Sequence, residues 1–227
     1  PYYYYGYYGN YVPLPILENA LKIAVNDTDR AHAHYLIAMT LRYQGGDMGP
    51  RVAREFQEAL KAGKSTEWHD DALFHYAQWL SQTGRMVKNA DGSYRNEPDY
   101  KKALELFRQL TTQYAKGETR YYDQAKAEIE NITKPVLSVS VANLFLPGSE
   151  IQYYLSWRNV KQINLALYPV DLTRDVILKD GSNDSWIQQL QLTQPIKTWT
   201  KDTNDTGNYI LRQEWMNLEE SIKPGSY

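Results

Sequence analysis

The sequence predicts an α+β chain in two domains, with α-helical hairpin repeats followed by an antiparallel β-sandwich. From about Ile16 to Ile132, apolar residues recur at three- and four-residue steps, which is the period of amphipathic helices. After Lys134 they alternate in short runs separated by Gly, Pro, Asn and Asp, as in a sandwich of short strands. We therefore expect three parts: a tyrosine-rich tail at 1–15, a helical domain at 16–134 and a β-sandwich at 135–227.

Five helices are expected in the helical domain. They lie at 29–46, 51–64, 66–84, 98–117 and 121–132. Gly45 and Gly46 should end the first helix, and Ser65 or Thr66 should cap the third. Pro98 suits the first turn of the fourth helix. The residues expected to face neighbouring helices are Ala31, Tyr35, Ala38, Met39 and Arg42 in the first helix, Val52, Phe56, Ala59 and Leu60 in the second, and Trp68, Ala72, Tyr76, Trp79 and Leu80 in the third.

Small and aromatic residues recur in the same order in successive helices. The series Ala77, Leu80, Gly84, Ala103 and Phe107 resembles the tetratricopeptide pattern, whose period is roughly 34 residues. This resemblance implies stacked helix hairpins with a concave face that can bind an extended peptide. The insertion RMVKNADGSYRNEP at 85–98 departs from the pattern. Its Asp91-Gly92 pair predicts a small β-hairpin.

Strands are expected throughout the second domain. The runs are VLSVSV at 136–141, with one solvent-facing side, then IQYYLSW at 151–157, INLALYPV at 163–170, WIQQLQL at 186–192, IKTWT at 196–200 and NYILRQEW at 208–215. The stretch 135–172 resembles the first macroglobulin-type domain of large bacterial alpha-2-macroglobulin-like proteins. The matching positions are Pro147-Gly148, Arg158-Asn159, Tyr168 and Asp171-Leu172. The ending IKPGSY at 222–227 resembles the turn before the last strand of such a domain, so we expect the domain to be truncated there.

The resemblance implies an exported protein, periplasmic or at the cell surface, whose parent engages proteases. Trapping members of that family carry a reactive thioester in a Cys-Gly-Glu-Gln motif. This chain contains no cysteine, so that chemistry cannot reside in these residues. The chain is then expected to be a scaffold segment of such an envelope protein.

Composition argues against two kinds of partner. The formal net charge is -2 and basic residues are interspersed with acidic ones, so no nucleic-acid partner is expected. No apolar run approaches the roughly 20 residues that cross a bilayer, so no membrane span is expected.

Candidate metal-ligating residues have a simpler structural interpretation. His32 and His34 are two positions apart on a helix and point to different faces. His69 and His75 flank acidic residues, and Asp71 to His75 is an i,i+4 step that permits a hydrogen bond. No third ligand has suitable spacing, so neither metal nor other cofactor is expected.

Catalytic motifs are equally weak, and we expect no enzyme. Glu214, Glu219 and Glu220 suit a solvated surface better than a glycosidase pair. Gly148-Ser149 and Gly181-Ser182 lack the GxSxG elbow of serine hydrolases. DTNDTGN at 202–208 has partial calcium-loop spacing, but its strand-like flanks favour a hairpin turn.

The tyrosine-rich start, PYYYYGYYGNYVPLP, has neither helical nor alternating periodicity. Tyrosine buries a large ring while its hydroxyl finds a partner. We therefore expect a docking strap that packs on the helical domain or on another subunit, with a linker ordered by assembly contacts as the alternative. Its residues are Tyr2, Tyr3, Tyr4, Tyr5, Tyr7, Tyr8 and Tyr11.

The function expected from the sequence is a non-catalytic protein-interaction scaffold that binds a protein or peptide through its helical repeats. The parent protein would be a protease inhibitor. Two alternatives stay open: a substrate-presenting accessory module of an extracytoplasmic hydrolase, and a surface component that self-associates through the tyrosine tail.

Overall fold

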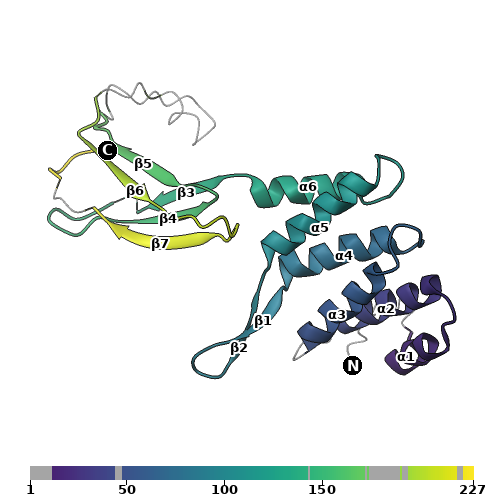
Figure 1. Ribbon diagram of the computed structural model, residues 1–227. Coiled ribbons are helices and arrows are strands. Elements are labelled where there is room, and N and C mark those ends of the chain that lie inside the picture. The colour runs from purple at the N-terminus through teal and green to yellow at the C-terminus, as the bar shows by residue number, and fades with distance from the viewer. Residues whose placement is uncertain are drawn as a thin grey trace, which may run out of the picture. The chain divides into compact units, whose positions relative to one another are not determined.

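The computed structural model describes residues 12–43, 48–142, 144–171, 173, 190, 194–218 and 222–227 (Figure 1). Contacts divide the chain into two compact units, Pro1–Thr133 and Lys134–Tyr227. In the described residues the first unit holds six helices and a β-hairpin, and the second holds five strands. The predicted mixture of helices and antiparallel strands is confirmed.

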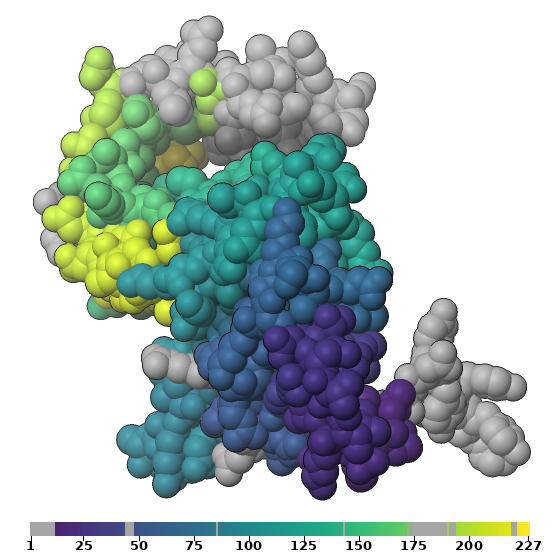
Figure 2. Space-filling view, turned by 45° about the vertical axis from the view of Figure 1, so that its right-hand side comes forward, coloured from purple at the N-terminus to yellow at the C-terminus, as the bar shows by residue number. Residues whose placement is uncertain are grey.

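Each helix of the first unit packs against the next helix along the chain. Figure 2 shows this order as a colour gradient within the unit, from purple at α1 to teal at α6. The helices are α1 (Leu14–Ile23), α2 (Asp27–Leu41), α3 (Gly49–Leu60), α4 (His69–Gln82), α5 (Tyr100–Gln113) and α6 (Tyr122–Thr133). α1 precedes all five helices that the sequence predicted.

Two helices begin at side-chain caps. The Asn26 side chain accepts a hydrogen bond of 2.7 Å from the Asp29 backbone N–H at the start of α2. The Asp99 carboxylate accepts one of 3.0 Å from the Lys102 N–H at the start of α5. Such bonds satisfy N–H groups that lack a partner in the first helical turn. Pro98 therefore precedes the cap of α5, and its predicted place in the first turn is wrong.

The predicted cap of α4 is also wrong. The helix begins at His69 after Trp68, with no side-chain cap. The hydroxyls of Ser65 and Thr66 instead donate to the carbonyl oxygens of Ala62 and Gly63. Short polar side chains often bond the preceding backbone in this way and form a turn. The predicted stop at Gly45 and Gly46 lies outside the described residues.

The core of the first unit is broader than the predicted stripes. α2 contacts α1, α3 and α4, so Ile37 and Leu41 are buried as well as Ala38. Met39 and Arg42, which were expected in the stripe, are only partly buried. α4 is buried on most of its surface; its buried residues are His69, Asp71, Ala72, Leu73, Phe74, Tyr76, Ala77, Trp79 and Leu80. Trp68, expected in that set, is partly buried.

The insertion folds as the predicted hairpin. β1 (Arg85–Lys88) pairs antiparallel with β2 (Tyr94–Glu97), and β1 contacts α3. The hairpin extends away from the helices (Figure 1). Gly84 allows this exit because its φ of 63° lies in the left-handed region, where glycine meets no steric cost.

The second unit contains two antiparallel sheets that share one apolar cluster. β3 (Val136–Val141), β4 (Gln152–Arg158) and β7 (Arg212–Asn217) form one sheet in the order β3-β4-β7. β5 (Gln162–Leu167) and β6 (Lys197–Asp202) form the other. The buried cluster is Tyr153, Leu155 and Trp157 of β4 with Ile163 of β5. Trp199 of β6 and Met216 of β7 pack against it.

The strands largely follow the predicted runs, but β5 ends at Leu167 instead of Val170 and β7 begins at Arg212 instead of Asn208. β3 differs from the prediction in its exposure. Leu137, Val139 and Val141 lie opposite the buried β4 residues, so they share the core-facing side of the sheet. They are nevertheless about half exposed, because β3 is an edge strand among the described residues. The run 186–192 falls outside the described residues except for Leu190, which is in no strand.

Candidate functional site

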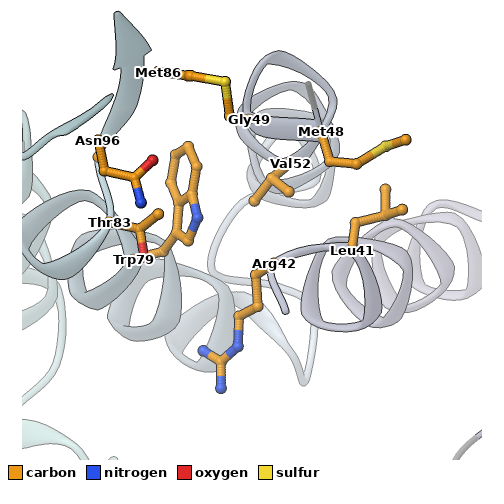
Figure 3. A pocket seen from close by; sticks show the side chains of 10 residues that line it. Leu41, Arg42, Met48, Gly49, Val52, Trp79, Thr83, Met86 and Asn96 are labelled. Atoms are coloured by element: carbon orange, nitrogen blue, oxygen red, sulfur yellow. The ribbon is translucent and has the colours of Figure 1, made fainter. Parts of the chain in front are cut away.

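A mostly apolar pocket lies where α2, α3, α4 and the hairpin meet in the first unit. Figure 3 shows the indole of Trp79 between the hairpin residues Met86 and Asn96 on one side and Val52 on the other. Its lining residues are Leu41, Arg42, Met48, Gly49, Val52, Trp79, Thr83, Gly84, Met86 and Asn96. Its empty space is about 420 Å³, counting the open mouth. Concave apolar sites with a few polar groups at the edge are the usual form of binding sites.

Arg42 is the charged residue at the edge of this pocket. Its guanidinium group extends away from the indole of Trp79 (Figure 3). It lies 4.5 Å from the ring centroid of Tyr43 and donates a hydrogen bond to the Tyr43 hydroxyl. Tyr43 is 78% exposed, so this cation and its aromatic partner form an accessible rim.

A polar cluster lies close to Arg42 and links α2, α4 and the residues before α6. The Tyr35 hydroxyl is 3.0 Å from Nδ1 of His75, which is also 3.0 Å from the Asp71 carbonyl oxygen. The Asp71 carboxylate accepts hydrogen bonds from the Tyr121 hydroxyl at 2.7 Å and from Arg120 at 2.6 Å. The predicted bond between Asp71 and His75 therefore exists, but it uses the backbone carbonyl and leaves the carboxylate for Tyr121 and Arg120.

Burial and nearby charges keep this cluster in one protonation state near neutral pH. Burial lowers the pKa of His75, and the positive charges of Arg42 and Arg120 lower it further. Burial raises the pKa of Tyr35 and Tyr121, and the neighbouring Asp71 carboxylate raises both further. The imidazole is thus neutral and both phenols keep their protons, so the cluster offers hydrogen bonds and no phenolate nucleophile.

A second buried polar group lies in the middle of α3. Glu55 is 5% exposed, and its carboxylate lies 2.7 Å from Nδ1 of His34 and 3.1 Å from Arg54. Burial would raise the pKa of Glu55, but these bonds outweigh burial and hold the pKa below its usual value. We interpret it as a structural tie between α2 and α3.

The remaining histidines have aromatic neighbours. His32 stacks on Trp68, with 3.9 Å between ring centroids and 5° between planes. Nδ1 of His69 lies 3.0 Å from the Tyr114 hydroxyl. Burial lowers the pKa of both histidines and raises that of Tyr114 to about 12. In the described residues, no three His, Asp or Glu side chains gather as metal ligands.

The DTNDTGN segment is a connection between sheets, and the predicted hairpin is wrong. β6 pairs with β5 and β7 pairs with β4, so 203–211 passes from one sheet to the other. The Asp205 carboxylate accepts a hydrogen bond of 3.0 Å from the Gly207 N–H, which closes a local turn.

Glu214, one of the three acidic candidates, pairs with Lys201 at 2.7 Å. Glu219, Glu220, Gly181 and Ser182 lie outside the described residues, as do the seven tail tyrosines Tyr2, Tyr3, Tyr4, Tyr5, Tyr7, Tyr8 and Tyr11.

Sequence reasoning missed the pocket, although it identified parts of its wall. It assigned Trp79 and Val52 to helix-facing stripes and Asp91-Gly92 to a hairpin. The signal that could have located the pocket is the position of that hairpin, since β1 begins three residues after α4 ends and carries Met86 toward the same helices.

A scan against models of protein families, a search of curated proteins and a search of solved structures each found no match for this chain. Within the described part of the chain, no helix combines the length and apolar character needed to traverse a lipid bilayer.

Proposed function

We propose that this chain is a non-catalytic protein-interaction scaffold whose helical unit binds a peptide segment of a partner. The observation that carries the proposal is the apolar pocket at the junction of α2, α3, α4 and the hairpin, with Arg42 at its rim. An apolar side chain of the peptide enters beside Trp79. The guanidinium of Arg42, on the side of the pocket away from Trp79, pairs with a carboxylate elsewhere in the same peptide.

The packing of the helices supports this role. Each helix contacts its neighbour in sequence, as in tetratricopeptide-like arrays that present binding surfaces along a stack. The polar cluster of Tyr35, His75, Asp71 and Tyr121 ties three segments together next to the pocket. These hydrogen bonds hold the helices around the pocket in place before a partner binds. Less conformational entropy is then lost on binding.

The second unit supports assignment of the chain to a larger exported envelope protein of the alpha-2-macroglobulin-like kind. Two antiparallel sheets pack around Leu155 and Trp157, an arrangement that suits a macroglobulin-type sandwich. Protease inhibition belongs to the parent protein in this proposal, and the chain contributes recognition.

A displayed library of random peptides tests the proposal. Peptides enriched on the full chain should share an apolar residue and, within a few residues of it, an acidic residue or a terminal carboxylate. Their affinities should fall about tenfold or more with Arg42→Glu and with Met48→Glu, because each change places a negative charge at the rim. Tyr94→Glu, at an exposed hairpin position outside the pocket lining, is the matched control. Failure to enrich peptides, or equal affinity for all three variants, would overturn the proposal.

A further inference from the structure

The outer face of the β3-β4-β7 sheet carries two aromatic rings in a polar surface. In strand pairing, Ser140 lies opposite Tyr154, and Tyr154 lies opposite Trp215, so the three side chains form one row on this face. The rings of Tyr154 and Trp215 are 5.0 Å apart between centroids, with planes inclined at 52°. Trp215 is 68% exposed, although tryptophan in a folded protein is highly buried on average.

The neighbouring rows add hydroxyl and amide groups. Ser138, Ser156 and Gln213 form the row on one side, and Gln152 pairs with Asn217 on the other side. No charged residue occurs at these eight positions; the nearest charge on this face in the strand pairing is Arg158, opposite Val136 and two rows from the aromatic row. The opposite face of the sheet carries the apolar cluster of Tyr153, Leu155 and Trp157. The exposed aromatics are therefore outside the core of the second unit.

We propose that this face binds an uncharged carbohydrate chain. An aromatic ring presents a flat apolar face to the C–H face of a sugar ring, and the surrounding amides and hydroxyls exchange hydrogen bonds with sugar hydroxyls. The inclination between Tyr154 and Trp215 suits consecutive sugar rings that are turned relative to one another. An open sheet face suits an extended oligosaccharide, since single sugars bind in concave sites.

The composition of the face favours a carbohydrate over a protein. The centre of a protein interface is enriched in aromatic residues, Met and Arg and is depleted in Ser. Here the groups next to the two rings are serine hydroxyls and amides. This site does not depend on the pocket in the first unit, so the two proposals can fail separately.

The test is titration of the full chain with three soluble hexasaccharides: cellohexaose, chitohexaose and maltohexaose. Calorimetry up to about 10 mM ligand covers the weak affinities expected for an open face. At least one hexasaccharide should bind, and Trp215→Ala should weaken it about tenfold or more. Tyr94→Ala removes a 55% exposed aromatic ring from the hairpin and should leave the affinity unchanged.

Two further measurements separate the outcomes. Gln213→Ala should weaken binding without removing a ring, and raising salt from about 0.05 to about 0.5 M should not change the affinity of a neutral ligand. Absence of binding by all three hexasaccharides would overturn the proposal. So would unchanged affinity in Trp215→Ala, or peptide selection in which enrichment depends on Trp215.

Discussion

The Asp71 carboxylate in α4 accepts a hydrogen bond of 2.7 Å from the hydroxyl of Tyr121, fifty positions later and directly before α6. Both residues are buried, at 8% and 6% exposure. Arg120 donates to the same carboxylate oxygen, but its side chain is 71% exposed. The buried hydroxyl therefore holds α6 to α4 more effectively than the ion pair does.

Tyr121→Phe should lower the free energy of unfolding by about 1–2 kcal/mol, because it removes the buried one of the two donors to this Asp71 carboxylate oxygen. The aromatic ring and its stacking on Phe74 are retained. Urea denaturation measures the change. Arg120→Gln is the matched control and should cost less than about 1 kcal/mol, as exposed ion pairs do. An equal or larger cost for Arg120→Gln would contradict this ranking.

Gly84 is the point where the backbone of the hairpin closes onto the end of α4. A Cβ atom at this position would lie 2.0 Å from the Glu97 carbonyl oxygen and 2.5 Å from Cα of Pro98. Gly84→Ala should destabilise the protein by at least about 3 kcal/mol, since both obstructing groups are backbone. Thermal and urea denaturation measure this loss.

Gly92 provides the control for the glycine prediction. It also has a positive φ, 85°, but a Cβ there meets nothing within 4 Å. Gly92→Ala should cost only about 1–2 kcal/mol, the cost of a left-handed conformation in a residue with a side chain. Equal costs for the two substitutions would show that the contact with Glu97 is relieved by movement of the hairpin.

Three histidines make stability depend on pH. Burial is the main cause of a lowered pKa at His32, His69 and His75. The unfolded chain therefore binds protons first as pH falls below the ordinary histidine pKa, about 6.5. Because the unfolded state then holds more protons, the free energy of unfolding should decrease from about pH 7.5 to about pH 5.5.

Urea denaturation at several pH values measures this slope. His69→Gln removes one of the three groups and should make the slope shallower, although it also removes the contact with Tyr114 and lowers stability at every pH. Glu55 does not interfere, since its lowered pKa places its titration below this window. A flat profile, or a rise in stability toward pH 5.5, would be incompatible with neutral buried histidines.

Local patterns predicted the elements better than the contacts between them. The helical period located α2 to α6 within a few residues, except that the first was expected to reach Gly46 and α2 ends at Leu41. Asp91-Gly92 predicted the hairpin because a short turn depends mainly on its own backbone; the connection at 89–93 has Gly92 in the left-handed region, at a φ of 85°. The DTNDTGN segment has similar turn residues, yet it joins two sheets. Its outcome depends on β6 pairing with β5, whose partner residues are 30 to 40 positions away in sequence, and no local pattern indicates that pairing.

The candidate site was harder to predict for the same reason. Asp71 looks like any acidic residue in a first helical turn, and its burial depends on Tyr121 fifty positions later. Trp157 and Trp215 both lie in alternating strands, but one is 4% exposed and the other 68%. Strand register decides which face each ring occupies, and register is set by pairing along the whole sheet.

Glu55 gives a prediction about a buried charge. Its carboxylate is nearly enclosed and is held by His34 at 2.7 Å and by Arg54 at 3.1 Å. Glu55→Ala should lower the free energy of unfolding by about 2–3 kcal/mol, because it removes hydrogen bonds to a charged group and leaves His34 without its partner. Glu105→Ala breaks the exposed pair with Lys102 and should cost less than about 1 kcal/mol. Urea denaturation at pH 7 compares the two variants, and a similar cost for both would mean that water replaces the partners of His34 after the substitution.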